Sequence, residues 1–184
     1  MRQSSCRLAL GLLLLSATAS LFALKIELPV SGHGVLRCEF PDGWKEEGRN
    51  VPEGLPATVT CERSGPFRGA FLLTVMWSPD NDPNFGSEEN ARGVIRHMRD
   101  KLLASAVETE LPLVAIQGTQ GSGFYFAATD KNYKAGAGQY PVATSGALGA
   151  DGLLLVFTVL SDGGNDPAVK EALAAVCQAS LAKR

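Results

Sequence analysis

Residues 70–77, Ala-Phe-Leu-Leu-Thr-Val-Met-Trp, are the stretch that decides the fold of this 184-residue chain. The run carries no charged side chain and lies between Gly69 and Ser78, which is typical of a β-strand. Because it is almost wholly apolar, we expect it to be a central strand that is covered on both faces. We therefore expect the elements on either side of it in the sequence to pack against it as layers.

Upstream of this strand the sequence alternates between strand-like runs and turns. Residues 35–40 predict a strand that stops at Pro41-Asp42-Gly43, where proline fixes φ and glycine accepts positive φ. Residues 45–56 are charged and interrupted by glycine and proline, and they predict a surface loop. Residues 57–64 predict a further strand, whereas residues 24–30 alternate only weakly and fit an edge strand or a loose arm.

Downstream, the hydrophobic period changes to that of an amphipathic helix beginning at Ser87 as N-cap. Strands are predicted at residues 113–117, 124–129, 140–145 and 153–160, with glycine-rich turns between them. A last helix is predicted to follow Asp166, because Pro167 is favoured at the first helical position. Consecutive strands with two amphipathic helices predict an α+β fold, in which the helices pack on an antiparallel β-sheet.

The first nineteen residues have the three parts of a secretory signal peptide. Arg2 and Arg7 give the positive start, residues 8–15 are an apolar run too short to span a bilayer, and Ala17-Thr18-Ala19 is a small-x-small exit. We therefore expect residues 1–19 to be cleaved and residues 20–184 to form a single exported domain, periplasmic or extracellular. No later run reaches membrane length, so no membrane insertion is expected after cleavage.

Charge and cysteine content narrow the classes of function. The whole chain carries a formal charge of −2, and removal of Arg2 and Arg7 makes it more negative, which argues against nucleic-acid binding. In an oxidising compartment, the strand-borne Cys38 and Cys61 predict a disulfide that would contribute roughly 3 kcal/mol. Cys177 falls on the apolar side of the last helix. The alternative is three buried free thiols.

Two loops resemble ligand-binding motifs without completing them. Asp80, Asp82 and Asn84 present oxygens at alternate positions, as calcium loops do, but Ala91 stands where the bidentate glutamate belongs. An ordinary turn into the helix is the favoured interpretation. The glycines at residues 118–123 are followed by a strand rather than a helix, which favours a hairpin over a phosphate loop. No metal or cofactor is expected.

The titratable residues offer little for catalysis. His33 lies in a glycine-flanked stretch and His97 on the polar side of a helix, and no Gly-x-Ser-x-Gly elbow accompanies them. A hydrolase that uses dispersed carboxylates stays open as an alternative, as does a small-ligand or calcium binder. Arg92, Arg96 and Arg99 form one row on the predicted helix, which indicates either a solvated face or a surface for an acidic protein partner.

Several of these elements together resemble a known pair of families. Phe40-Pro-Asp-Gly-Trp44 after a strand, the apolar run 71–77, the helix from Ser87 and the ending 154–161 before a last helix look like the PsbP-like and DcrB families. The resemblance implies an exported α/β/α sandwich that acts without catalysis, as a binding, assembly or chaperone-like module. The expected function is therefore contact with an envelope or secreted protein.

Overall fold

The computed structural model describes residues 22–80, 82–136 and 138–182, so the predicted signal peptide at residues 1–19 lies outside the described residues. Ten strands and two helices follow in order: β1 (Phe22–Val30), β2 (Gly34–Pro41), β3 (Trp44–Asn50), β4 (Ala57–Arg63), β5 (Gly69–Trp77), α1 (Glu88–Leu103), β6 (Val114–Gln117), β7 (Ser122–Thr129), β8 (Val142–Ala150), β9 (Leu153–Ser161), α2 (Pro167–Cys177) and β10 (Ser180–Ala182).

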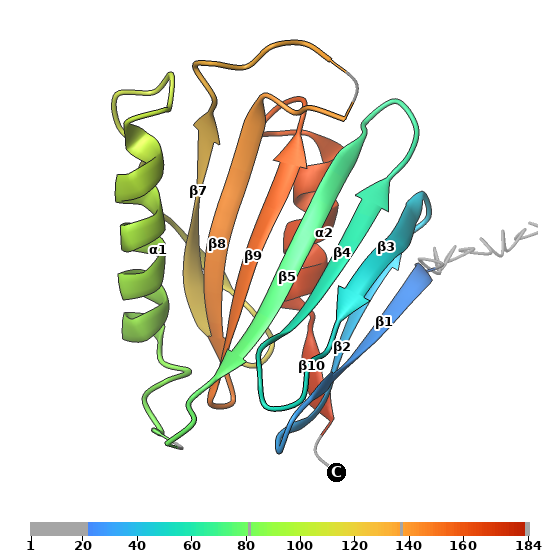
Figure 1. Ribbon diagram of the computed structural model, residues 1–184, viewed down its shortest axis with the longest axis vertical. Coiled ribbons are helices and arrows are strands. Elements are labelled where there is room, and N and C mark those ends of the chain that lie inside the picture. The colour runs from blue at the N-terminus through green and yellow to red at the C-terminus, as the bar shows by residue number, and fades with distance from the viewer. Residues whose placement is uncertain (1–21, 81, 137, 183–184) are drawn as a thin grey trace, which may run out of the picture.

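The strands form two antiparallel sheets. The larger has the order β3-β4-β5-β9-β8-β7-β6, and the smaller has the order β1-β2-β10. Every paired strand runs antiparallel to its neighbour. The predicted α+β class and the antiparallel sheet are thus confirmed, and β5 and β9 lie at the centre of the large sheet (Figure 1).

One face of the large sheet is buried over β4, β5 and β9 and partly buried over β7. The smaller sheet and α2 pack on it, and the side chains of Phe71, Leu73 and Val75 on β5 are completely buried there. Phe40 of β2 lies with its ring centroid 5.2 Å from that of Phe71 and 5.0 Å from that of Trp44. This aromatic cluster joins the two sheets, which makes the space between them the main core.

The opposite face of the large sheet is covered only in part. Helix α1 packs on β7 and β8, where Ala91 and Ile95 are fully buried together with Phe126. Figure 1 shows α1 at one side of the sheet, with α2 behind it on the other face. A single helix is about 10 Å wide, roughly two strand spacings, and so it cannot reach the middle of a seven-stranded sheet.

Two sequence-based expectations are therefore wrong. The stretch 70–77 is not covered on both faces, because α1 docks two strands away and leaves Leu72 42% exposed. The expected loop 45–56 begins instead as the edge strand β3, whose charged side chains face solvent. The alternation in 24–30 does produce a strand, β1, which pairs with β2 along its whole length.

Both predicted helix starts are confirmed. Ser87 is the N-cap of α1, and its hydroxyl accepts a hydrogen bond from the backbone N–H of Asn90 at 3.2 Å. Helix α2 begins at Pro167 after Asp166, whose side chain makes no capping hydrogen bond. The proline itself therefore defines this start, since its fixed φ suits a first helical turn.

Candidate functional site

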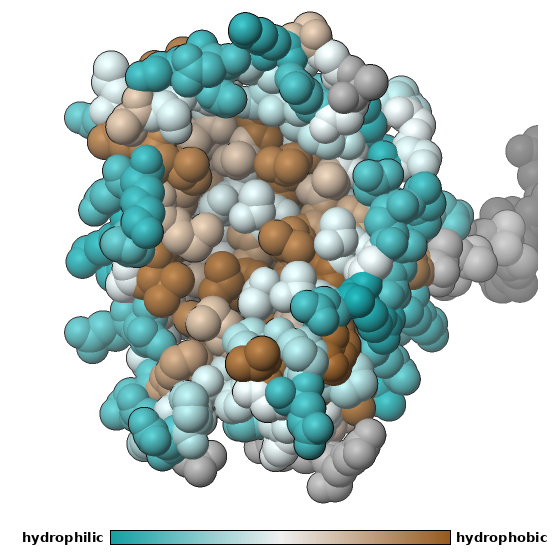
Figure 2. All heavy atoms as spheres, in the orientation of Figure 1, coloured by the Kyte–Doolittle hydropathy of each residue, from teal (hydrophilic) through white to brown (hydrophobic). Residues whose placement is uncertain are grey.

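The outer surface of β9, β5 and β4 has no helix packed on it in the described part of the fold. We call it the open face. Strand pairing aligns its side chains in rows, with Ala70 opposite Leu160, Leu72 opposite Thr158, and Thr74 opposite both Val156 and Thr58. Figure 2 shows apolar and neutral side chains across this face, which is hollowed between hydrophilic rims.

The open face is apolar and neutral over β5 and β9. Leu72 and Leu160 are 42% and 36% exposed, which is unusual for leucines at the centre of a sheet. The hydroxyls of Thr58 and Thr74 lie 3.2 Å apart and bond to one another across the strands. No charged side chain lies on β5 or β9 between residues 69–77 and 153–160, whereas β4 contributes the exposed Glu62 opposite Ala70. The surface over β5 and β9 can therefore bury a partner's apolar groups without desolvating a charge.

A pocket of about 390 Å³, which we call the hollow, adjoins the open face at the end of α1. Its floor is formed by Ala128, Ala143 and Leu160, and its walls by Leu102 and the Tyr140-Pro141 segment. The same face of β7 carries Phe124 and Phe126 beneath α1. The strand thus changes from phenylalanine to alanine at the point where the helix ends, and this leaves the space unfilled. The remaining lining residues are Ser105, Ala106, Thr129, Asp130 and Asn132.

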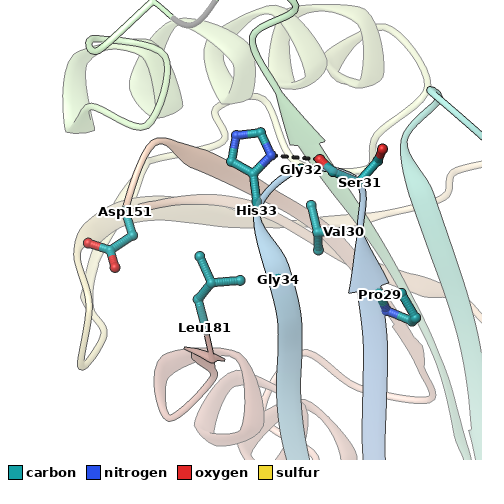
Figure 3. Close-up of a pocket in the computed structure, with 8 residues that line it drawn as sticks. All are labelled: Pro29, Val30, Ser31, Gly32, His33, Gly34, Asp151 and Leu181. Carbon is teal, nitrogen blue, oxygen red and sulfur yellow. Dashed lines mark hydrogen bonds between the residues drawn. The ribbon is translucent and has the colours of Figure 1, made fainter. Parts of the chain in front are cut away.

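A second depression, of about 740 Å³, lies at the tip of the β1–β2 hairpin, next to Asp151 and Leu181 (Figure 3). Its histidine, His33, bonds through Nδ1 to the backbone carbonyl of Ser31 at 2.8 Å. The Asp151 carboxylate points away from the imidazole ring. These residues do not form a nucleophile–base–acid chain, because the imidazole contacts a carbonyl rather than a hydroxyl.

The predicted arginine row is only partly available to a partner. Arg92 forms an ion pair with Glu88 at 3.1 Å and stacks on the ring of Phe124, 4.1 Å from its centroid. Arg99 is paired with Asp100 at 2.7 Å. Arg96 is exposed. The row therefore lies on the flank of α1 above β7, away from the open face, and two of its three charges are offset by neighbouring carboxylates.

Residues of the predicted calcium loop form hydrogen bonds with one another and with the start of α1. One carboxylate oxygen of Asp82 accepts the N–H of Asn84 at 2.9 Å, and the carbonyl of Asn84 accepts the N–H of Ser87. This is the turn that leads into α1. Among the described residues, no three acidic, histidine or cysteine side chains are grouped as metal ligands.

The predicted disulfide between Cys38 and Cys61 is absent from the structure, and Cys177 is likewise a free thiol. The first two stand on different sheets, β2 and β4, and both are buried in the core between them. Burial raises the pKa of each to about 12, and Glu46 adds to the effect at Cys61. Both cysteines therefore act as small apolar groups with little thiolate character.

Sequence reasoning missed the open face, although a signal for it is present. Threonines recur at outward positions of neighbouring strands, at 58, 60, 74 and 158. Such residues suit a surface that is half buried. The apolar run 70–77 by itself does not indicate where the helices dock.

Comparisons with known proteins add little to this geometry. No protein-family model and no curated protein matches the sequence. A 1.50 Å crystal structure from Bacteroides thetaiotaomicron VPI-5482 matches with a TM-score of 0.47 and 18% identity, over 81% of this chain and 46% of that chain. The chain thus spans about half the length of that protein. Neither described helix is long and apolar enough to cross a membrane.

Proposed function

We propose that the protein is an exported, non-enzymatic binding or assembly module of the cell envelope, and that a protein partner docks on its open face. The observation that carries the proposal is the exposure of Leu72 and Leu160 at the centre of a sheet whose other face is buried over β4, β5 and β9. Secretory features in residues 1–19 and the resemblance to the PsbP-like and DcrB families support it.

The dimensions of the open face favour a single helix as the docking element. Three strands about 4.8 Å apart and seven residues long give a surface of about 14 by 23 Å, or about 300 Å². A helix about 10 Å wide and four turns long covers about two thirds of that area and fits beside α1. A second copy of this chain is a poorer fit, since stable interfaces bury about 800 Å² on each partner.

A hydrolase that uses dispersed carboxylates is the less supported alternative. Beside the hollow the Thr129 hydroxyl does contact the Glu108 carboxylate at 2.6 Å, but the pKa of Glu108 is lowered, which makes it a weak base. In the depression the imidazole of His33 contacts a backbone carbonyl. The partner is expected to present an apolar stripe flanked by polar side chains, because the open face is apolar at its centre and hydrophilic at its rim.

A site-specific photo-crosslinker tests this proposal. Placed at Leu72, it should capture one envelope protein through an amphipathic helical peptide, identified by mass spectrometry of the crosslink. Placed at Val107, which is 62% exposed away from the open face, it should not. With the purified partner, Leu72→Lys should then weaken binding at least tenfold, and Val107→Lys should leave it unchanged.

Three results would count against the proposal. Equal crosslinking from the two positions would mean that the open face is not the docking surface. A crosslink to a second copy of this chain would replace the helix with a dimer. Loss of binding on reversal of Arg92, Arg96 and Arg99 to glutamate, with Leu72→Lys unaffected, would move the interface to the flank of α1 above β7.

A further inference from the structure

The hollow has the size and composition of a site for a small molecule. Its 390 Å³ lies within the usual range of ligand pockets, about 300–1,000 Å³. That space corresponds to on the order of a dozen water molecules, and hence to a ligand of roughly a dozen non-hydrogen atoms. Alanines 106, 128 and 143 with Leu102 and Leu160 make most of its surface apolar.

The hollow offers two hydrogen-bond acceptors near the end of α1, Ser105 and Asp130. The hydroxyl of Ser105 donates its one proton to the carbonyl of Leu102 at 3.0 Å, so toward a ligand its oxygen can only accept. Thr129 follows Ala128 along β7, so its side chain lies on the other face of the sheet, where its hydroxyl donates to Glu108. The hollow therefore favours a molecule that donates hydrogen bonds.

The second acceptor is the carboxylate of Asp130, an exposed residue that is held in place by hydrogen bonds of its own. One of its carboxylate oxygens accepts the N–H of Asn132 at 2.8 Å, and its own N–H donates to the carbonyl of Pro141 at 2.8 Å. The neighbouring Lys131 does not neutralise it, because the Lys131 ammonium bonds to the carbonyl of Ala104 at the end of α1. Among the described residues no ion pair involves Asp130.

We propose that the hollow binds a small organic ammonium ion with an apolar or aromatic body. The body fills the space above Ala128 and Ala143, and the ammonium group donates to Asp130 and to the Ser105 hydroxyl. This proposal does not depend on the protein partner, which contacts β5 and β4 around Leu72. The two sites share only Leu160, and the tests below leave it unchanged.

Tryptamine is a suitable probe, because its twelve non-hydrogen atoms match the estimated size and it carries one ammonium group. Isothermal titration calorimetry with the chain should give saturable binding of tryptamine. Indole-3-propionate keeps the ring but replaces the ammonium with a carboxylate, and it should bind at least tenfold more weakly. Equal binding of the two compounds, or of neither, would overturn the proposal.

Two substitutions locate the site. Ala143→Leu fills the hollow and should abolish tryptamine binding, whereas Ala115→Leu adds the same volume on exposed β6 and should not. Asp130→Asn keeps the oxygen that accepts from Asn132 but removes the charge, so it should weaken binding about tenfold. Asp42→Asn in the β2–β3 turn is its control. Unchanged affinity in both Ala143→Leu and Asp130→Asn would exclude the hollow.

Discussion

Glu171 of α2 provides the sharpest test of how the covered face is held together. One of its carboxylate oxygens, Oε2, accepts the indole N–H of Trp44 and the Nε–H of Arg63, each at 2.7 Å, and Oε1 accepts from Nη2 of Arg63 at 3.2 Å. These bonds join α2 to β3 and β4. The side chains of Arg63 and Glu171 are only 13% and 24% exposed.

Glu171→Ala should lower the free energy of unfolding by about 2–3 kcal/mol. A buried indole N–H without its acceptor costs about 1 kcal/mol, and a charge-assisted pair about 1.5–3 kcal/mol, reduced here because both partners retain some exposure to solvent. For a domain of this length the loss corresponds to a fall in Tm of roughly 5–10 °C. Truncation is the costly change because it leaves the Arg63 charge without its partner.

Urea denaturation followed by tryptophan fluorescence and circular dichroism measures the effect. The matched control is Glu27→Ala, which removes an ion pair with Arg37 whose side chains are 62% and 55% exposed. That change should cost less than about 0.5 kcal/mol. If Glu171→Ala cost no more than Glu27→Ala, the carboxylate would not be fixing α2 to the sheet, and our explanation of the covered face would fail.

Three further predictions concern stability and chemistry. Gly149→Ala should destabilise the fold strongly, because the new Cβ would lie 2.2 Å from the carbonyl oxygen of Gly86. Gly93→Ala, in the middle of α1 where no atom lies close, should stabilise the fold by about 0.5–1 kcal/mol. Thermal melts compare the two variants. Alkylation and mass measurement of the unfolded, unreduced chain from residue 20 onward should find three free thiols. A single free thiol would instead support the predicted disulfide between Cys38 and Cys61. Burial opposes ionisation of Glu108, but hydrogen bonds from Thr129 outweigh it and hold the pKa of Glu108 below its ordinary value. That stabilisation is present above the unfolded pKa of about 4.3 and is lost as the pH falls through the folded pKa. The difference in unfolding free energy between the wild type and Glu108→Gln should therefore be present at pH 7 and shrink in acid. A difference that stays constant with pH would refute this prediction.

Local signals in the sequence were sufficient to predict where the two helices begin. Ser87 and Pro167 mark helix starts through the geometry of single residues, and the structure has helices beginning after the one and at the other. The edge strand β3 could not be found in this way. Its charged side chains look like those of a loop, and only pairing with β4 makes them a strand, a contact that the local pattern does not encode.

The candidate sites depended even more on distant contacts. The apolar run 70–77 indicated a strand but not which of its faces would be covered, since that depends on α1 docking over β7 and β8. Arg92 and Arg99 were visible as a row, yet their pairing with Glu88 and Asp100 depends on side-chain geometry. The hollow requires Ala128 and Ala143 to meet across two strands, which no local pattern predicts.

The pairing in the small sheet fixes the order in which its strands can come together during synthesis. Its central strand β2 pairs on one side with β1 and on the other with β10, so that Arg37 lies opposite both Glu27 and Ser180. A chain that emerges from a ribosome or a translocation channel N-terminus first can form the β1–β2 hairpin early. It cannot complete the sheet until residue 180 has emerged, and until then β2 keeps an unpaired edge. The small sheet therefore closes only after residue 180 has been synthesised.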